Sequence, residues 1–507
     1  MSRVIVSRGN IDRSLSAVPQ QSLLDCLRSA GYDLPAPCGG NGRCGKCRLE
    51  IMSEKGRETV LACRYIPRGD ISLVLPERMG GQLLGGDDMG IRPLPPREGL
   101  GLALDLGTTS LAASLYDLET GDFLGTKAEW CVLGSYGSDV LSRCRHAMER
   151  GTEEMCLALR RQAMDMGHEL KAKSGSSKEI KEIYAAGNTV MEHIFAGLDP
   201  SGLGIAPFEG ESLFRRFKAM ELEGAEIHLA PCAASYVGGD IMAGLMASGF
   251  TEQPGCRLFL DLGTNGEMAL IRDGQISSCA VACGPAFEGA GISCGMASMP
   301  GAVEKLSWSG SEPEALVIGG GEAKGICGSG LISIAALLLE KGLIDGGGRL
   351  LPPEEAAPGF EKWLGEDERG NGVFSLGSEL ELRAEDVRAL QLAKAAVAAG
   401  IELLLETQSL EPEEIDELCL AGGFSMGLDL SAAAKIGLLP ESLAEKARLL
   451  GNSSLRGAAL ALMDMGARET LERLADNCLY MDLSGDRGFD DAFIDHMSFF
   501  EEEEGWN

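Results

Sequence analysis

The chain has 507 residues, enough to bury several hydrophobic cores, and its formal net charge of −31 argues against a nucleic-acid-binding surface. A chain of this length does not need its 16 cysteines as disulfide staples. It has no long apolar N-terminal stretch and no run of 18 apolar residues, so we expect neither a signal peptide nor a membrane-spanning helix. We therefore predict a soluble cytoplasmic protein with reduced thiols.

Four cysteines near the N-terminus have a spacing close to that of plant-type [2Fe–2S] ligands, with one extra residue in the first gap. Three lie on one Gly-rich loop and the fourth follows in a later segment: Cys38, Cys44, Cys47 and Cys63. Cys26 competes as the fourth ligand, but it lies on the apolar face of a helix expected over residues 20–30. Residues 1–78 are therefore predicted to form a compact α+β module that carries the cluster, which makes electron transfer the first hypothesis.

Positive charge is concentrated in this module. Residues 1–80 contain 12 Lys and Arg against 8 Asp and Glu, so the acidic excess lies in the rest of the chain. Four basic residues accompany the predicted ligands: Arg43, Lys46, Arg48 and Arg64. This rim either attracts an acidic partner, or docks the module on the acidic body, or offsets the negative charge of the cluster. The sequence favours none of these readings.

Residues 79–98 are rich in Gly and Pro and are predicted to be a linker, partly extended by its prolines. Beyond them, strand-like and helix-like segments alternate, which indicates α/β architecture. An apolar strand that ends in D-L-G-T and precedes a second apolar strand begins near Gly101 and again near Arg257. This repeat predicts two similar domains that face each other across a cleft, residues 99–250 and 251–507.

The two D-L-G-T turns have the chemistry of phosphate-binding loops. A glycine lets the backbone approach a phosphate, and backbone N–H groups and threonine hydroxyls can donate to its oxygens. An aspartate at the strand end can hold Mg²⁺ through water. The first loop comprises Asp105, Gly107, Thr108 and Thr109, and the second comprises Asp261, Gly263, Thr264 and Asn265. On opposite walls, two such loops can clamp the phosphates of ATP.

A third Gly-rich turn follows an apolar strand and contains Gly422, Gly423 and Ser425. In isolation it would be read as a strand-to-helix turn. Beside two phosphate loops it is predicted to receive the ribose or adenine of ATP. The sequence contains no G-x-x-x-x-G-K-[ST] motif, so it does not predict a P-loop enzyme.

Three polar residues accompany other turns of the body. Asn188 and Thr189 are expected either to face phosphate or water, or to cap a helix. Asp240 is expected to be a helix N-cap, a carboxylate that supports Mg²⁺ indirectly, or both. Four cysteines in apolar segments have irregular spacing, so buried packing is favoured over a second cluster: Cys279, Cys283, Cys294 and Cys327.

The three turns resemble those of the superfamily of acetate and sugar kinases, heat-shock proteins and actin. Its members have two ribonuclease-H-like domains that close on ATP. The resemblance implies that Asp105 and Asp261 are the catalytic carboxylates, which position metal and water, and that hydrolysis is coupled to hinge closure.

Nearly the whole chain resembles the reductive activators of corrinoid-dependent enzymes. Besides the cysteine spacing, the resemblance is carried by motifs such as G-S-D-V-L-S-R, A-A-G-N-T-V-M-E-H and G-P-A-F-E-G-A-G-I, within residues 137–143, 185–193, 237–245, 284–292, 326–332 and 388–402. It implies an α/β multidomain fold, with an N-terminal β-grasp ferredoxin module and an ATPase body of the actin and sugar-kinase type, and it places Glu288 in the cleft. The short linker departs from the longer linker domain of many members, so we expect the module to lie closer to the body.

The resemblance implies ATP-dependent reduction of cob(II)alamin to cob(I)alamin on a corrinoid protein that serves methyl transfer. It implies a [2Fe–2S] cluster, ATP and Mg²⁺ as cofactors, a low-potential donor such as a ferredoxin or flavodoxin, and a homodimer, with no nucleic-acid or membrane partner. Two alternatives stay open. A redox-sensing small-molecule kinase would hydrolyse ATP only in the presence of the metabolite that it phosphorylates. An ATP-gated adaptor would bind a metalloprotein without changing the spectrum of its cobalt.

Overall fold

The structure, a computed structural model, describes most of the chain. The described residues are 2–8, 11–18, 20–30, 42, 47–53, 56–75, 90–250, 254–309, 312–377 and 380–499. Of the predicted cluster ligands, Cys47 and Cys63 lie within these ranges and Cys38 and Cys44 lie outside them. None of the helices in the described part is long and apolar enough to cross a membrane.

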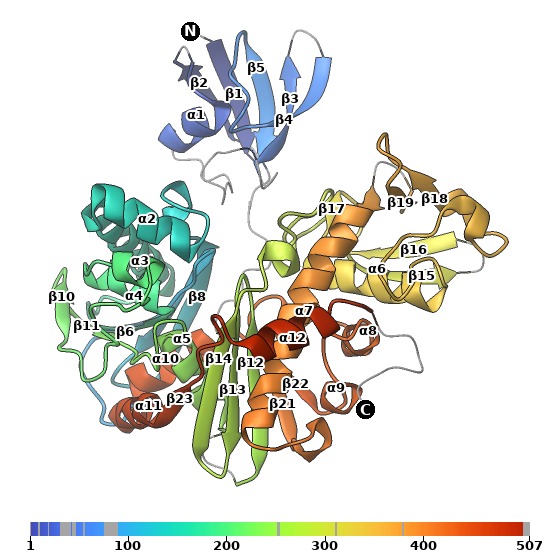
Figure 1. The fold of residues 1–507 in the computed structure, drawn as a ribbon. Helices are drawn as coiled ribbons and strands as arrows, with labels where there is room; N and C mark the ends of the chain where they lie inside the picture. Colours follow the sequence, from blue (N-terminus) through green and yellow to red (C-terminus); the bar gives the residue numbers. More distant parts are fainter. Residues whose placement is uncertain are drawn as a thin grey trace.

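A five-stranded sheet with one helix forms the N-terminal module, drawn in blue in Figure 1. β1 pairs antiparallel with β2 and parallel with β5, and β3 pairs antiparallel with β4 and β5. Leu23, Leu24 and Leu27 of α1 are buried together with apolar residues of the sheet, so the module has a core of its own. The bounds are β1 Ser2–Arg8, β2 Ile11–Ala17, α1 Leu23–Ser29, β3 Arg48–Ser53, β4 Gly56–Leu61 and β5 Ile71–Leu75.

The body contains two six-stranded sheets. The first has the order β10-β11-β9-β6-β7-β8 and the second the order β22-β21-β12-β13-β14-β23. The first sheet comprises β6 Leu100–Leu106, β7 Ser110–Asp117, β8 Phe123–Trp130, β9 Ile180–Gly187, β10 Met220–Leu222 and β11 Ala225–Leu229. The second comprises β12 Cys256–Leu262, β13 Gly266–Arg272, β14 Gln275–Val281, β21 Glu417–Ala421, β22 Ala447–Gly451 and β23 Cys478–Tyr480. We call the two halves built on these sheets the first and second lobes.

The two sheets repeat one topology. In each, three antiparallel strands are followed by a strand parallel to the first, so β6-β7-β8-β9 corresponds to β12-β13-β14-β21. Asp105 lies beside Ala186 of β9, and Asp261 lies beside Ala421 of β21. The D-L-G-T repeat therefore predicts the duplicated strand hairpins correctly, and the duplication extends to the next strand of each lobe.

Helices cover both sheets. In Figure 1, α2, α3 and α4 lie on the outer side of the first lobe, while α5 and α10 lie between the lobes. The first lobe contributes α2 Val140–Arg150, α3 Glu153–Ser174, α4 Thr189–Ala196 and α5 Gly239–Ser248. The second contributes α6 Gly328–Glu340, α7 Ala384–Thr407, α8 Leu430–Lys435, α9 Glu441–Ala444, α10 Ser453–Met463, α11 Met465–Asn477 and α12 Arg487–Asp495.

The helices α5 and α10 join the lobes. A single apolar cluster contains residues of both helices together with Ala103 of β6 and Phe259 of β12. Gly457 of α10 lies directly against the backbone of Ala243 of α5, so a side chain at this position would collide with it. This close packing joins the two lobes through α5 and α10.

The second lobe carries two small sheets in addition to the duplicated core. They have the orders β16-β15-β17 and β18-β19-β20, and α6 packs on β15. The strands are β15 Ala302–Ser309, β16 Glu312–Val317, β17 Gly325–Ile326, β18 Leu364–Glu366, β19 Gly372–Ser375 and β20 Glu381–Arg383.

The second half of the predicted linker is attached to the body. The backbone of Leu94 exchanges hydrogen bonds with Met463 and Met465, at the junction of α10 and α11. Arg97 Nε donates to Glu182 of β9 over 2.8 Å, and its Nη2 donates to the carbonyl of Leu462. Because residues 90–98 contact both lobes, they form an anchor rather than a free linker.

Residues 487–499 lie across α7, and the helix α12 within them packs against α7. Lys394 of α7 is fully buried, and its Nζ donates to the Ser498 carbonyl over 2.6 Å and lies 5.7 Å from the centroid of the Phe499 ring. Beside it, His496 Nε2 lies 2.6 Å from Glu402 Oε2. Burial lowers the pKa of Lys394 to about 7 and also lowers the pKa of His496 below its usual value.

Lys394→Met is expected to flatten the pH dependence of stability. The Lys394 pKa in the unfolded chain is about 10.4, so between pH 7 and 10 the unfolded state binds one more proton than the folded state. The free energy of unfolding should therefore rise with pH in this window, by roughly 1 kcal/mol per pH unit for this group. Anaerobic urea unfolding from pH 7.5 to 9.5 measures both slopes, and equal slopes for the two proteins would contradict the prediction.

Candidate functional site

The two D-L-G-T turns lie at the ends of equivalent hairpins, one in each lobe. Asp105 near the end of β6 accepts hydrogen bonds from Asn452 Nδ2 over 2.8 Å and from Ser454 Oγ over 3.0 Å. Asn452 is the N-cap of α10, so a helix of the second lobe begins at the aspartate of the first. These hydrogen bonds favour the ionised form of Asp105, but burial outweighs them and raises its pKa.

Burial raises the pKa of four carboxylates at this junction, and neighbouring carboxylates raise three of these pKa values further. Burial, and then the neighbouring Asp105, raise the pKa of Asp261 to about 7. Burial, and then Asp261 and Asp105, raise the pKa of Asp240 to about 8, and burial with Asp240 raises the pKa of Glu267 well above its usual value. Asp240 lies in the first turn of α5 and accepts from the backbone of Ile241, but the N-cap is Gly238, so the N-cap interpretation of Asp240 is wrong. The junction therefore gathers acidic side chains whose ionisation is opposed by burial.

Direct metal coordination by these groups is not seen. Among the residues that the structure describes, no three or more His, Cys, Asp or Glu side chains are arranged to hold a metal ion. The carboxylates are close enough to interact but not to form a coordination shell by themselves. An arrangement of this kind suits a cation that keeps its own water molecules.

Glu288 connects the two D-L-G-T turns. Its Oε1 accepts from Thr264 Oγ1 over 2.9 Å, and its Oε2 accepts from Thr109 Oγ1 over 3.3 Å. A Cβ atom placed on Gly263 would lie 3.9 Å from Glu288 Oε1, so the carboxylate lies over the second turn. One carboxylate of the second lobe thus accepts from a hydroxyl of each turn.

The first turn is also held by its own lobe. Asn188 caps α4 by accepting from the backbone of Met191, and its Nδ2 donates to Thr108 Oγ1 over 2.9 Å. The helix-cap interpretation of Asn188 is therefore confirmed, and its contact with phosphate or water stays a prediction. Arg143, which is 1% exposed, donates from Nη2 to the carbonyl of Thr108 over 2.7 Å.

Thr189 lies behind this turn. It is 1% exposed, and its hydroxyl donates to the carbonyl of Ala234 over 3.0 Å. In this conformation it supports the loop from inside the protein, and the N-cap of α4 is Asn188, so the helix-cap interpretation is wrong for Thr189. A contact between Thr189 and a ligand stays a prediction.

The third Gly-rich turn begins where β21 ends, beside the second D-L-G-T turn. Gly422 has φ of 84°, and a Cβ there would lie 2.5 Å from Asp261 Oδ1, so the position requires glycine. Gly423 is exposed, whereas Ser425 is buried and donates to the Gly422 carbonyl over 2.8 Å. The Ser425 hydroxyl stabilises the turn, and Gly423 is the part of it that a ligand can approach.

Comparisons with known proteins agree with this arrangement. The family described as "C-terminal domain of RACo the ASKHA domain" matches residues 255–506, "RACo middle region" matches residues 100–253, and "2Fe-2S iron-sulfur cluster binding domain" matches residues 8–68. The chain is 28% identical to the corrinoid activation enzyme RamQ of Eubacterium limosum, over 95% of this chain and 97% of the relative. It is 27% identical to the [Co(II) methylated amine-specific corrinoid protein] reductase of Methanosarcina barkeri, over 70% and 68%.

A solved structure, that of a reductive activator for corrinoid,iron-sulfur protein, has the same fold over 98% of both chains, with a TM-score of 0.71 and 27% identity. The chain belongs to the family of reductive activators of corrinoid-dependent enzymes. The predicted fold class is confirmed: a [2Fe–2S] ferredoxin-type domain precedes an α/β body of the actin and sugar-kinase type. This activator therefore has an iron–sulfur domain and a nucleotide-binding body.

Two of the four predicted cluster ligands of the activator lie in adjacent segments. The backbone N–H of Ala62 donates to the carbonyl of Cys47 over 2.9 Å, which brings the segment of Cys63 beside Cys47. Cys47 is 1% exposed and Cys63 is partly buried against the same apolar cluster. Cys26 is buried in this cluster, where burial raises the pKa of its thiol. These positions fit the predicted choice of Cys63, which stays a prediction.

The other described cysteines of the activator form no disulfide bonds. Cys279, Cys283 and Cys327 are buried and direct their thiols at the backbone carbonyls of Gly400, Val281 and Val303. With Cys294 they do not form a metal-binding group in the described part of the chain. This agrees with the preference for buried packing over a second cluster.

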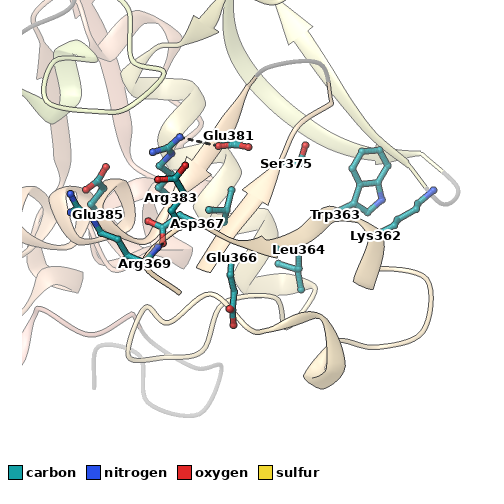
Figure 2. Close-up of a pocket in the computed structure, with 13 residues that line it drawn as sticks. Lys362, Trp363, Leu364, Glu366, Asp367, Arg369, Ser375, Glu381, Arg383 and Glu385 are labelled. Atoms are coloured by element: carbon teal, nitrogen blue, oxygen red, sulfur yellow. Dashed lines mark hydrogen bonds and ion pairs between the residues drawn. The ribbon is translucent and has the colours of Figure 1, made fainter. Parts of the chain in front are cut away.

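A pocket of about 640 Å³ lies on the β18-β19-β20 sheet (Figure 2). Its side chains carry both signs of charge, and Arg383 pairs with Glu381 at 3.2 Å. None of its lining residues belongs to the Gly-rich turns. It is therefore separate from the site built around Asp105 and Asp261.

Sequence reasoning missed three supports of the phosphate loops. Arg143 holds the backbone of Thr108, and Asn452 and Ser454 hold Asp105 from 347 and 349 residues away. Arg143 ends the G-S-D-V-L-S-R motif, so a buried arginine within an otherwise polar motif was an available signal. Asn452 and Ser454 have no motif of their own, because their role appears only when α10 packs against the first lobe.

Proposed function

We propose that this chain is an ATP-dependent reductive activator that supplies one electron to the Co(II) of a corrinoid protein and so regenerates Co(I) for methyl transfer. The supporting observation is that two equivalent phosphate-type loops, one from each lobe, meet at Glu288 in a chain that also has a [2Fe–2S] domain. A cluster-binding domain joined to a nucleotide-dependent hinge suits an electron transfer that needs an energy input.

The proposed reaction moves one electron from a donor to cobalt and uses the energy of ATP hydrolysis. A low-potential donor, a ferredoxin or a flavodoxin, gives one electron to the module, and the same electron converts Co(II) to Co(I). When bound, the [2Fe–2S] cluster supplies a one-electron carrier with a reduction potential of about −400 mV. Each 100 mV of uphill transfer costs about 2.3 kcal/mol, so hydrolysis of one ATP suffices for an acceptor somewhat below that potential.

In this proposal, different residues bind the nucleotide, the metal ion and the cluster. The hydroxyls of Thr108, Thr109 and Thr264 donate to phosphate oxygens, and Gly422 and Gly423 leave space for the adenosine. Asp105 and Asp261 orient Mg²⁺ through water and position the attacking water. Burial raises the pKa of both carboxylates, and Asp105 raises that of Asp261 further, which fits a site that a divalent cation would stabilise. Cys38, Cys44, Cys47 and Cys63 hold the cluster.

The decisive experiment mixes the anaerobic protein with a reductant, Mg·ATP and a corrinoid protein in the Co(II) state. Loss of the Co(II) spectrum should occur with ATP and be absent both without ATP and with a nonhydrolysable analogue. A corrinoid protein that stays Co(II) while a metabolite stimulates ATP turnover would instead favour the kinase alternative. Complex formation with no change at cobalt would favour the adaptor. Light scattering of the same sample tests the expected homodimer.

A further inference from the structure

The proposed binding of phosphate in the cleft does not explain why a carboxylate, Glu288, lies there. A carboxylate cannot donate to a phosphate, and at neutral pH its charge repels one. Nevertheless it accepts from Thr264 of the second lobe and from Thr109 of the first, the hydroxyls that the proposed function assigns to phosphate oxygens. It also lies above Gly263, where a phosphate would approach the backbone.

The segment that carries Glu288 is held firmly. The ring of the preceding Phe287 stacks on Phe424 of the third Gly-rich turn, with centroids 4.9 Å apart. Gly289 has φ of 69° and ends the short 3₁₀ turn Pro285–Glu288. Gly328, the first residue of α6, lies so close to the Phe287 carbonyl that a side chain there would collide with it. The carboxylate is therefore positioned by the second lobe and reaches across to the first.

We infer that Glu288 is an anionic latch: without nucleotide, its carboxylate takes the place of a phosphate between Thr109 and Thr264, and the arriving phosphate displaces it. This inference rests on the proposed function, because it assumes that the two threonines bind phosphate. The two threonine hydroxyls both donate, so one group with two acceptor oxygens can join them. A carboxylate and a phosphate each have such oxygens. Binding of the nucleotide then opens the one carboxylate bridge that joins the two loops, which links occupancy of the site to movement of the lobes.

Glu288→Gln is expected to tighten nucleotide binding. The amide has the same size but no charge, and its NH₂ end cannot accept from a threonine hydroxyl, so the bridge loses one end. The Kd for Mg·ATP should fall about tenfold, equivalent to about 1.4 kcal/mol. The Kd for Mg·ADP should fall less, and that for adenosine, which has no phosphate, should not change. Calorimetry on the anaerobic full-length protein measures all three.

Two further variants complete the test. Glu314→Gln removes one charge from an exposed position on β16 and should leave all three affinities unchanged. Thr264→Val removes one end of the latch and also a phosphate donor, so it should weaken Mg·ATP binding several-fold. In hydrogen exchange, residues 105–110 of nucleotide-free Glu288→Gln should exchange faster than in the wild type, and with Mg·ATP the difference should disappear.

The outcomes are distinct. Unchanged or weaker Mg·ATP binding by Glu288→Gln overturns the latch, as does an equal shift for ATP, ADP and adenosine, which would indicate a purely structural effect. In either case a wild type that binds Mg·ATP leaves the proposed function standing. A wild type that binds no nucleotide overturns both the latch and the ATP dependence of the proposed function.

Discussion

Asp261→Asn should lower the rate of ATP hydrolysis by about 100-fold, the lower end of what the loss of one preorganised electrostatic group costs. Asp261 lies at the end of β12, within electrostatic reach of Asp105 and Asp240 and against Gly422 of the third turn. The asparagine keeps the shape of the side chain but cannot hold Mg²⁺ or water through a negative charge. Steady-state phosphate release under anaerobic conditions measures the effect.

The matched control is Asp273→Asn, the same change at the exposed far end of the β13–β14 hairpin. It should hydrolyse ATP at the wild-type rate, and both variants should keep the visible spectrum of the cluster. Hydrolysis by Asp261→Asn within threefold of the wild type would refute the role given to this carboxylate. So would a loss of the cluster spectrum in this variant, because the proposal places the cluster and the nucleotide in different domains.

Cys47→Ser should abolish reduction of Co(II) while most of the Mg·ATP affinity is retained. A serine hydroxyl is a poor substitute for a thiolate ligand, and Cys47 lies buried beside the segment of Cys63. The D-L-G-T turns belong to sheets whose apolar clusters, among the described residues, are separate from that of the N-terminal module. Visible and electron paramagnetic resonance spectra report the cluster, and calorimetry reports the affinity for ATP.

Cys26→Ser is the control within the same module. It changes a thiol of the same core but not a predicted ligand, so the cluster spectrum should persist. Cobalt reduction at the normal rate by Cys47→Ser would exclude this cysteine as a ligand. If Cys26→Ser lost the cluster while Cys63→Ser kept it, the choice of the fourth ligand would be wrong.

The sequence predicts the fold well where a short motif repeats itself. Both D-L-G-T turns and the Gly422 turn follow apolar strands, and a strand followed by a glycine is visible in the sequence alone. What it could not show is that Gly187 and Gly422 occupy equivalent places: Ala186 pairs with Asp105 as Ala421 pairs with Asp261, and each glycine follows directly. The Ala-Gly pair that the two turns share is too short to be a distinctive signal, and the strand pairing relates them.

The contacts that assemble the site could not be predicted, for a physical reason. Asn452 meets Asp105, and Glu288 meets Thr109, through packing between segments far apart in the sequence. Such contacts depend on the crossing of α5 and α10 between the lobes, which hydrophobic spacing within one helix does not specify. The third case is the anchor: within residues 79–98, predicted to be a linker partly extended by its prolines, the hydrogen bonds of Leu94 and Arg97 attach the chain to the body, which composition alone does not show.

The anchor fixes one end of the tether that holds the iron–sulfur module. Between Leu75 of β5 and Gly90 lie the 14 residues 76–89, which span at most about 50 Å at 3.3–3.6 Å each. A module on so short a tether has an effective concentration near the body that reaches the millimolar range and falls steeply as the tether is lengthened. For a corrinoid protein docked on the body, delivery of the electron would then be a first-order event, with a rate that does not depend on how dilute the activator is.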